Sequence, residues 1–277
     1  MKTPVIIIGA AGRMGKTLVA CSLNHEKCSL FGATEHTGSS LIGQDAGLVA
    51  GVANSSIAIN ADLSALLKAN NEAVTIDFSS PKATLTHVSL SVSQKNPIVI
   101  GTTGFTDLER ENILKAAKEI PIVMAPNMSL GVNTLFVLTE LAAKILNNGF
   151  DIEVFEAHHN LKKDAPSGTA VKLAEILAES TNRSYPKDFV FGREGIVGER
   201  SKNEIGMQVM RGGDIVGDHT VFYCGMGERV ELTHRATSRS TFALGALAAA
   251  HWVSKQKPGL YDMKDVLGLK NLKLSAS

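Results

Sequence analysis

The densest group of chemically capable side chains lies in residues 156–170. It holds two adjacent histidines, His158 and His159, followed by Lys162. An imidazole titrates near neutral pH and can deliver a proton, while a protonated lysine stabilises negative charge that develops in a reaction. The turn Pro166-Ser167-Gly168-Thr169 then opens a predicted helix, whose free N–H groups suit a carboxylate. The stretch predicts a proton donor, a cation and an anion site close together.

Metal binding is the weaker interpretation of the histidine pair. No cysteine, third histidine or His-x-His spacing completes a ligand set beside it, so we expect no metal. The three cysteines, Cys21, Cys28 and Cys224, are odd in number and follow no CxxC spacing. They lie among apolar neighbours, which is typical of reduced thiols in a cytoplasmic protein.

A second candidate site is the glycine-rich turn at residues 9–15, which follows the apolar run 5–8 and precedes a helical pattern. Backbone N–H groups and the positive end of the helix dipole would hold a pyrophosphate there. The spacing is GxxGxxG, with Ala11 at the usual middle glycine, and Glu35 follows Gly15 by 20 residues. A carboxylate at that distance accepts hydrogen bonds from the adenosine ribose. We therefore expect a dinucleotide to contact Gly9, Ala10, Ala11, Gly12, Arg13, Met14 and Glu35.

The residues around Glu35 bear on the choice of cofactor. Glu35 would repel a 2′-phosphate, and the following His36 is a weaker phosphate partner than an arginine. Arg13 and Lys16 are close enough in sequence to approach such a phosphate. We expect NADH to be accepted at least as well as NADPH.

Two more loops follow predicted strands and could be loops and nothing more. Residues 101–105 follow the run 98–100, and residues 125–129 follow the run 122–124. The carboxyl ends of parallel strands form the crevice in which doubly wound sheets bind ligands. Hydroxyls, an amide and bare glycine backbone suit the nicotinamide ribose and carboxamide. The candidate residues are Gly101, Thr102, Thr103, Ala125, Pro126, Asn127 and Met128.

The elements that must position these residues change character along the chain. Up to about residue 125, β-branched runs alternate with amphipathic segments, which is the signature of βαβ units and a Rossmann-type, doubly wound parallel sheet. The runs occupy residues 5–8, 29–34, 57–59, 73–78, 98–100 and 122–125. The helical segments occupy residues 14–24, 62–68, 82–92 and 106–118.

The second half predicts an α+β domain with a mixed sheet. Helices are expected at 132–147 and 168–180, and strands at 151–157, 204–210, 215–223 and 229–237. Consecutive strands without helices between them imply an antiparallel or mixed sheet with one open face. Periodicity alone does not assign the helix at 241–255 and the tail after it to either domain.

Composition excludes several classes of protein. The 277 residues carry a formal charge of +1 and are 44% hydrophobic, which disfavours both disorder and a nucleic-acid partner. The apolar run at 242–253 is well short of a membrane span, and the short run at 5–8 passes directly into the glycine turn rather than a signal-peptide cleavage site. We expect no membrane anchor.

Residues 156–170 resemble the signature of the 4-hydroxy-tetrahydrodipicolinate reductase (dihydrodipicolinate reductase) family, His-His-x-x-Lys-x-Asp-Ala-Pro-Ser-Gly-Thr-Ala, at every fixed position. The resemblance extends to Gly9–Gly15, Glu35, 101–105, 125–133, 227–229 and 233–235. It implies an NAD(P)H-dependent reduction of a cyclic unsaturated dicarboxylate in diaminopimelate and lysine biosynthesis. By similarity, His158 donates or accepts the proton, Lys162 is a second donor that stabilises charge, His159 contacts substrate, and Gly168 and Thr169 hold a substrate carboxylate.

The resemblance also implies a domain plan and an assembly. A dinucleotide-binding domain would span residues 1–127 plus 240–277, because the tail helix returns to it. A substrate-binding domain would span 128–239, and its sheet would assemble a homotetramer.

The chain departs from the family pattern at three positions. Met128 stands where phenylalanine is common, His36 stands where many members have arginine, and Ala11 replaces a glycine that some members have. Two other functions stay open: another two-domain amino-acid or imine dehydrogenase, and a nucleotide sensor without catalysis. Neither explains a His-His-x-x-Lys element followed by a carboxylate turn.

Overall fold

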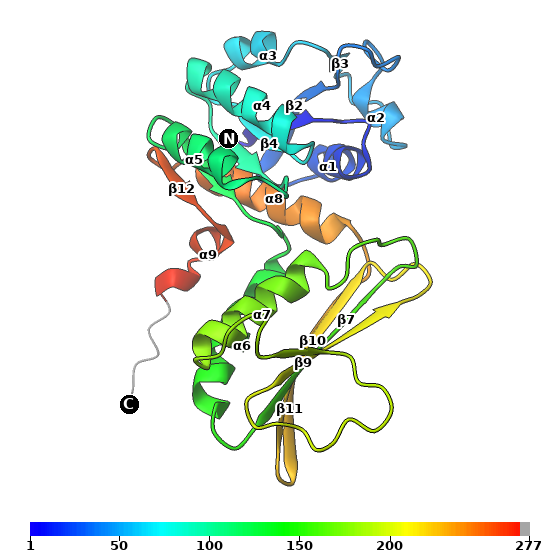
Figure 1. The fold of residues 1–277 in the computed structure, drawn as a ribbon. Coiled ribbons are helices and arrows are strands. Elements are labelled where there is room, and N and C mark those ends of the chain that lie inside the picture. The colour runs from blue at the N-terminus through cyan, green and yellow to red at the C-terminus, as the bar shows by residue number, and fades with distance from the viewer. Residues whose placement is uncertain (272–277) are drawn as a thin grey trace. The chain divides into compact units, whose positions relative to one another are not determined.

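The computed structural model describes residues 1–271 and divides the chain into two compact units (Figure 1). The first unit comprises Met1–Leu130 and the chain from Arg239 onward, and the second comprises Gly131–Ser238. The predicted fold class, a Rossmann-type parallel sheet with a second domain built on a mixed sheet, is confirmed. No helix within residues 1–271 is long and apolar enough to cross a membrane.

A seven-stranded, wholly parallel sheet forms the centre of the first unit, in the order β12-β6-β5-β4-β1-β2-β3. Its strands are β1 (Thr3–Ile8), β2 (Cys28–Thr34), β3 (Ile59–Asn60), β4 (Val74–Asp77), β5 (Ile98–Ile100), β6 (Pro121–Met124) and β12 (Gly259–Tyr261). Near-continuous runs of Val and Ile form the inner strands because both faces of a parallel sheet are buried.

Helices cover both faces of this sheet. They are α1 (Arg13–Leu23), α2 (Ala46–Val49), α3 (Leu63–Ala69), α4 (Pro81–Gln94), α5 (Asp107–Ala116), α8 (Ser240–Val253) and α9 (Met263–Val266). Sequence decides where several begin: Pro81 occupies the first turn of α4, and Thr106 and Glu109 form a capping box at α5. Alternating residues of β1 divide between the two cores, Val5 and Ile7 on one side and Ile6 and Ile8 on the other.

Helix α8 belongs to the first unit because its small side chains allow close packing. Ala243, Ala246, Ala249 and Ala250 are all buried in the core that α1 and the sheet share. Gly245 lies directly against the Met128 carbonyl, where an added Cβ would come within 1.8 Å of the oxygen. The helix that periodicity left unassigned therefore packs on the parallel sheet.

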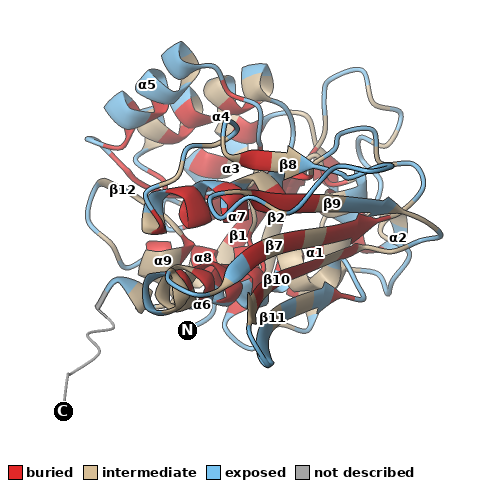
Figure 2. Ribbon diagram, turned by 60° about the horizontal axis from the view of Figure 1, so that its bottom comes forward, coloured by how far each residue is buried: buried red, intermediate tan, exposed pale blue. Residues whose placement is uncertain are grey.

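A five-stranded mixed sheet organises the second unit, in the order β11-β10-β7-β9-β8. Its strands are β7 (Asp151–His158), β8 (Phe189–Phe191), β9 (Ile205–Arg211), β10 (Gly217–Gly225) and β11 (Glu228–Ala236). β7 pairs antiparallel with β10 and parallel with β9, so the first strand of this unit lies at its centre. Figure 2 shows the buried stretches that run along β7, β9 and β10.

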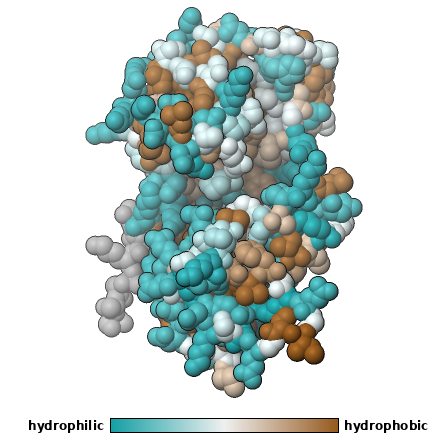
Figure 3. Space-filling view, in the orientation of Figure 1, coloured by the Kyte–Doolittle hydropathy of each residue, from teal (hydrophilic) through white to brown (hydrophobic). Residues whose placement is uncertain are grey.

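Two helices, α6 (Leu130–Leu146) and α7 (Gly168–Ser180), pack on one face of the mixed sheet. Ile152 and Val154 of β7 and Val221 and Tyr223 of β10 point into this core, and the Tyr223 hydroxyl donates to the Thr139 carbonyl at 2.9 Å. Residues at the alternate positions of these strands lie on the other face. Figure 3 shows apolar and hydrophilic surface side by side on this unit.

Several local predictions were wrong. The strand expected at 57–59 is β3, two residues long, because the turn before it is held by Asp45 through hydrogen bonds to Ser55 and Ile57. Ile215 precedes β10 rather than beginning it. The elements α2, β8, α9 and β12 were not predicted, because segments of three or four residues carry too little periodicity to be recognised.

Candidate active site

The glycine turn of the first unit has the shape that a phosphate site needs. Gly9 adopts a φ of +64°, and the Gly12 N–H donates to the Gly9 carbonyl at 2.9 Å, which closes the turn. A Cβ on Gly15 would lie 1.9 Å from the Gly9 carbonyl oxygen, so only glycine lets α1 begin so close to β1. The first turn of α1 has no acidic residue, and Gly12 supplies no side-chain cap. An anion therefore suits this helix end.

Glu35 contacts the glycine turn directly. Its Oε1 accepts a hydrogen bond from the Ala11 N–H at 2.8 Å, and its Oε2 accepts one from the His36 N–H at 3.3 Å. The Ala10 N–H donates to the carbonyl of Thr34, the last residue of β2. The turn and the carboxylate that sequence spacing predicted as one site are thus adjacent.

The other predicted cofactor loops follow strands that end at the same edge. The register aligns Ile8 with Asp77, Asp77 with Ile100, and Ile100 with Met124. Gly101 packs on the ring of Phe78, which an added Cβ would approach to 2.1 Å. The structure brings the turns that follow β1, β5 and β6 to one edge of the sheet.

Not every side chain in these loops faces outward. The Thr102 hydroxyl is buried and accepts a hydrogen bond from the Thr84 hydroxyl at 2.9 Å. The Met128 side chain lies in the core beside α8. Thr103 is exposed, and Asn127 Oδ1 accepts from the Ser129 N–H at 2.8 Å. Thr102 and Met128 therefore offer backbone rather than side chain to a ligand.

In the second unit, β7 brings His158 and Glu156 onto one face of the sheet. The two residues are separated by one position, so their side chains project on the same side. His158 Nδ1 lies 2.5 Å from Glu156 Oε2. Because an ionised carboxylate can only accept, the hydrogen lies on Nδ1, and Nε2 is the nitrogen left for proton exchange.

The Glu156 carboxylate is completely buried and has three donors. Arg211, from the last position of β9, donates to both carboxylate oxygens at 2.8 and 2.9 Å. The Ser167 N–H donates to Oε1 at 2.9 Å. Burial alone would raise the pKa of Glu156, but hydrogen bonds from His158, Arg211 and Ser167 lower it to about 2. Glu156 is therefore a permanent anion at neutral pH.

A second buried imidazole, His219 of β10, packs against His158. The two rings meet edge to face with their centroids 5.2 Å apart, and His219 Nε2 lies 3.0 Å from Ser167 Oγ. Burial first, and then the charge of His158, lowers the pKa of His219 to about 3, so it is neutral at physiological pH. Gly217 completes this corner, since a Cβ there would lie 3.0 Å from His158 Nε2.

Lys162 is tied to the same cluster through Asp164. Its Nζ lies 3.0 Å from Asp164 Oδ1, and the Asp164 carbonyl accepts a hydrogen bond from Arg211 Nη2 at 2.7 Å. Although burial acts to raise it, the pKa of Asp164 is lowered by its hydrogen bond to Lys162. The two predicted catalytic residues, His158 and Lys162, thus have partners that meet at one guanidinium.

Helix α7 begins beside this cluster, where the sequence predicted a carboxylate site. Ser167 is the N-cap, and its Oγ accepts from the Ala170 N–H at 3.2 Å. Gly168 is exposed, Thr169 is half-buried, and the first turn carries no acidic side chain. The backbone of His159, which follows β7, donates to the Ile215 carbonyl at 2.7 Å. This helix end is suited to an anion.

The sequence predictions missed the residues that surround His158: Glu156, Arg211, Gly217 and His219. The Glu-x-His spacing on a strand was a usable signal for Glu156, because alternation places both side chains on one face. Arg211 and His219 come from strands more than fifty residues away in sequence, so nothing local indicates them. A group of three or more His, Cys, Asp or Glu suited to a metal does not occur within residues 1–271.

Family comparisons bear on both units. The N-terminal dihydrodipicolinate reductase model matches residues 3–128, and the C-terminal dihydrodipicolinate reductase model matches residues 131–267. The chain belongs to the dihydrodipicolinate reductase family. The 4-hydroxy-tetrahydrodipicolinate reductase of Syntrophotalea carbinolica is 52% identical over 96% of this chain and 99% of its own length. That of Geobacter sulfurreducens is 50% identical over 97% and 100%.

Solved structures agree with this assignment. A dihydrodipicolinate reductase from Paenisporosarcina sp. TG-14, described as dipicolinate-bound, aligns with a TM-score of 0.76 at 26% identity over 96% of this chain and 99% of that one. An amine dehydrogenase from Mycobacterium smegmatis aligns with a TM-score of 0.59 at 11% identity over 94% of each chain. The second likeness shows the fold alone.

Proposed function

We propose that this chain catalyses the NAD(P)H-dependent reduction of 4-hydroxy-tetrahydrodipicolinate to tetrahydrodipicolinate in diaminopimelate and lysine biosynthesis. Relatives named for this activity are 50% and 52% identical over nearly the whole chain. The observation that carries the proposal is the cluster around His158, with a buried carboxylate on Nδ1 and an anion-binding helix end beside it. A chain that only sensed nucleotides would need neither.

A reduced nicotinamide, when bound, supplies the hydride that adds to ring carbon C4. Proton exchange at the neighbouring carbon and loss of water complete the balance, so one hydride and one proton are consumed for each water released. His158 Nε2 holds the exchanging proton, and the Lys162 ammonium stabilises charge on the ring and can supply a proton. His159, Gly168 and Thr169 hold the substrate, with a carboxylate at the start of α7.

The cofactor would lie on the first unit against the glycine turn and the loops that follow β5 and β6. Gly9, Ala10, Ala11, Gly12, Arg13 and Met14 would surround the pyrophosphate, and Glu35 would accept the ribose hydroxyls. Gly101, Thr102, Thr103, Ala125, Pro126, Asn127 and Met128 would form the nicotinamide end. Because Glu35 is a carboxylate that already contacts the turn, NADH should be accepted at least as well as NADPH.

We also propose the domain roles and the assembly that the family resemblance implies, together with the cytoplasmic location that the unpaired cysteines indicate. The first unit binds the dinucleotide, and the second binds the substrate and forms the oligomer. The face of the mixed sheet away from α6 and α7 carries half-buried Phe155 and Phe222 and buried Thr220, which suits packing against other copies in a homotetramer. Catalysis would take place in the cytoplasm.

The test follows cofactor oxidation with freshly generated 4-hydroxy-tetrahydrodipicolinate. His158→Gln and Lys162→Met should each lower kcat by about 100-fold, because each removes a group that transfers a proton or stabilises charge. Lys172→Met on α7, which removes an exposed lysine paired with Glu175, serves as the matched control and should keep the parental rate. Turnover near the parental rate in a variant that combines His158→Gln and Lys162→Met would refute the catalytic assignment. Wild-type protein that turns over with neither cofactor would favour another imine or amino-acid dehydrogenase.

A further inference from the structure

The Glu156 carboxylate can bind the same nitrogen of His158 before and after proton transfer. When the protonated ring gives up the hydrogen on Nε2, the remaining hydrogen stays on Nδ1, where Glu156 already accepts it. The ring therefore keeps one orientation and one hydrogen-bond partner throughout. Gly217 leaves room at Nε2, which any side chain at that position would crowd.

Arg211 binds the same carboxylate, including the Oε2 atom that His158 contacts. Its guanidinium donates to both oxygens of Glu156, so the negative charge that faces His158 is shared with a permanent cation. A carboxylate paired in this way attracts a proton on the imidazole less strongly than an unpaired one. The same guanidinium holds the Asp164 carbonyl and thereby the segment that carries Lys162.

We propose that Glu156 and Arg211 are positioning residues that set the charge of His158 in opposite directions. Glu156 stabilises the protonated ring and fixes Nε2 as the exchanging nitrogen, while Arg211 limits that stabilisation so that the proton can leave. The inference rests on the proposed function, because it takes proton transfer by His158 as given.

The charged and titratable groups that face His158 come from four parts of the second unit. Glu156 lies on β7, Arg211 on β9 and His219 on β10, while Lys162 and Asp164 lie on the segment between β7 and α7. His219 is neutral through burial, and Lys162 is paired with Asp164. Glu156 and Arg211 thus carry the two opposite charges that act on the His158 ring, and substituting each in turn separates their effects.

The central experiment compares pH–rate profiles of Glu156→Gln and Arg211→Gln. The amide removes the negative charge beside Nδ1, so the pH above which activity falls should drop by about one pH unit or more. Loss of the guanidinium leaves Glu156 a stronger partner for the protonated ring, so the same limb should move upward by a similar amount. KM for NADH should change less than twofold in both variants.

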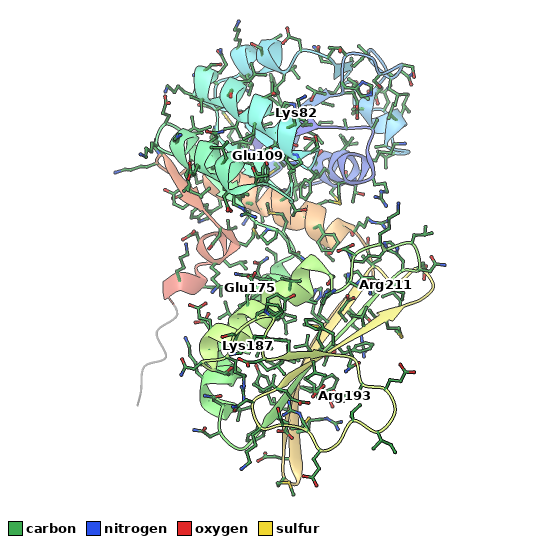
Figure 4. All side chains as sticks on the ribbon, in the orientation of Figure 1. Lys82, Glu109, Glu175, Lys187, Arg193 and Arg211 are labelled. Carbon is green, nitrogen blue, oxygen red and sulfur yellow. The ribbon has the colours of Figure 1, made fainter. Side chains whose placement is uncertain are left out.

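The chain offers a matched control in Arg193→Gln. Arg193 also donates to both oxygens of a β7 glutamate, Glu153, at 2.8 and 3.1 Å. Glu153 alternates with Glu156 along the strand and lies on the opposite face of the sheet. Figure 4 shows the two arginines at separate places on this unit. The Arg193 variant should keep the wild-type profile.

A second measurement does not depend on turnover. Histidine labelled with ¹³C reports ring protonation by NMR, with the His158 signal assigned by its absence from His158→Gln. The midpoint of the His158 titration should move down in Glu156→Gln and up in Arg211→Gln. If one variant fails to fold, the direction in which the His158 midpoint moves in the other variant, compared with Arg193→Gln, still tests the proposal.

The outcomes separate this inference from the proposed function. Wild-type protein without turnover refutes the proposed function and leaves the NMR comparison to judge the positioning role. The inference alone is overturned if the wild type turns over but the pH–rate profiles of the two variants do not move. It is also overturned if both profiles move in the same direction.

Discussion

The buried imidazole of His219 makes the second unit sensitive to mild acid. In the folded chain its pKa is lowered from 6.5 to about 3, first by burial and then by the charge of His158. Between those values the unfolded chain binds a proton that the folded chain refuses. The stability that a neutral His219 allows is therefore complete above pH 6.5 and is lost as the pH falls toward 3.

The size of the effect follows from the two values. One pH unit in this window is worth up to about 1.4 kcal/mol, and integration from pH 7 to pH 5 gives a loss of about 2 kcal/mol in the free energy of unfolding. Glu156 adds little in this range, because its pKa changes from 4.5 to about 2 on folding and its contribution is lost only as the pH falls below about 4.5. His219→Gln keeps a polar group near Ser167 Oγ and cannot take up a proton. The variant should lose about 2 kcal/mol less than the wild type over this interval.

The assay must report the second unit separately. Trp252, the single tryptophan, is half-buried against the core of the first unit, so its fluorescence follows that unit. Hydrogen exchange of β10 peptides in increasing urea follows the second. His251→Gln on α8 is the control, since it should leave the β10 transition unchanged at both pH values. If the free energy of unfolding fell equally in the wild type and in His219→Gln between pH 7 and pH 5, the acid sensitivity would not come from the buried neutral imidazole.

Three further predictions concern both units. Gly15→Ala should destabilise the first unit by about 1–3 kcal/mol and weaken NADH binding, because its Cβ would lie 1.9 Å from the Gly9 carbonyl oxygen. The Cβ of Gly12→Ala would lie 3.2 Å from the same oxygen, so this variant should lose less stability when both are unfolded in urea. Glu35→Gln should raise kcat/KM for NADPH relative to NADH by about tenfold, whereas Glu26→Gln should not; equal ratios would contradict the role of the carboxylate. Asp164→Asn should leave stability within about 1 kcal/mol yet raise KM for the dicarboxylate several-fold; an unchanged KM would contradict the positioning of Lys162.

Local pattern was sufficient for the elements around the glycine turn, although it missed the short α2, α9 and β12 of the first unit. β-branched runs, a glycine turn and a carboxylate 20 residues later determine where β1, α1 and β2 lie, and each contact involved is close in sequence or parallel in register. The strands' carboxyl ends share an edge by topology, so the loops after β5 and β6 could be placed beside the turn without knowing a single side-chain contact. The sequence could not show which way each side chain in these loops points. The Thr102 hydroxyl, for example, is buried against Thr84 instead of facing a ligand.

The second unit was harder for a physical reason. Its centre, β7, pairs with β9 and β10, which follow it by about fifty residues or more, and no periodicity encodes which strand inserts between which. The partners of His158 therefore come from positions with no local signal: Arg211 lies at the end of a half-exposed strand, and His219 lies between Asp218 and Thr220 near the start of β10. A buried ion pair of this kind is visible only once the register is known.

The charges around His158 show how a nearly neutral chain can hold an anion. Glu156 and Arg211 cancel each other, Lys162 and Asp164 cancel each other, and His219 is neutral. A proton on the His158 ring would be the one charge among these six groups without an equal opposite, and Glu156, the partner of this ring, accepts the Ser167 N–H at the start of α7. Under the proposed function, attraction for the dicarboxylate would depend on the same proton that His158 transfers. Transfer of that proton would remove the excess positive charge and so would weaken the hold on an anionic product.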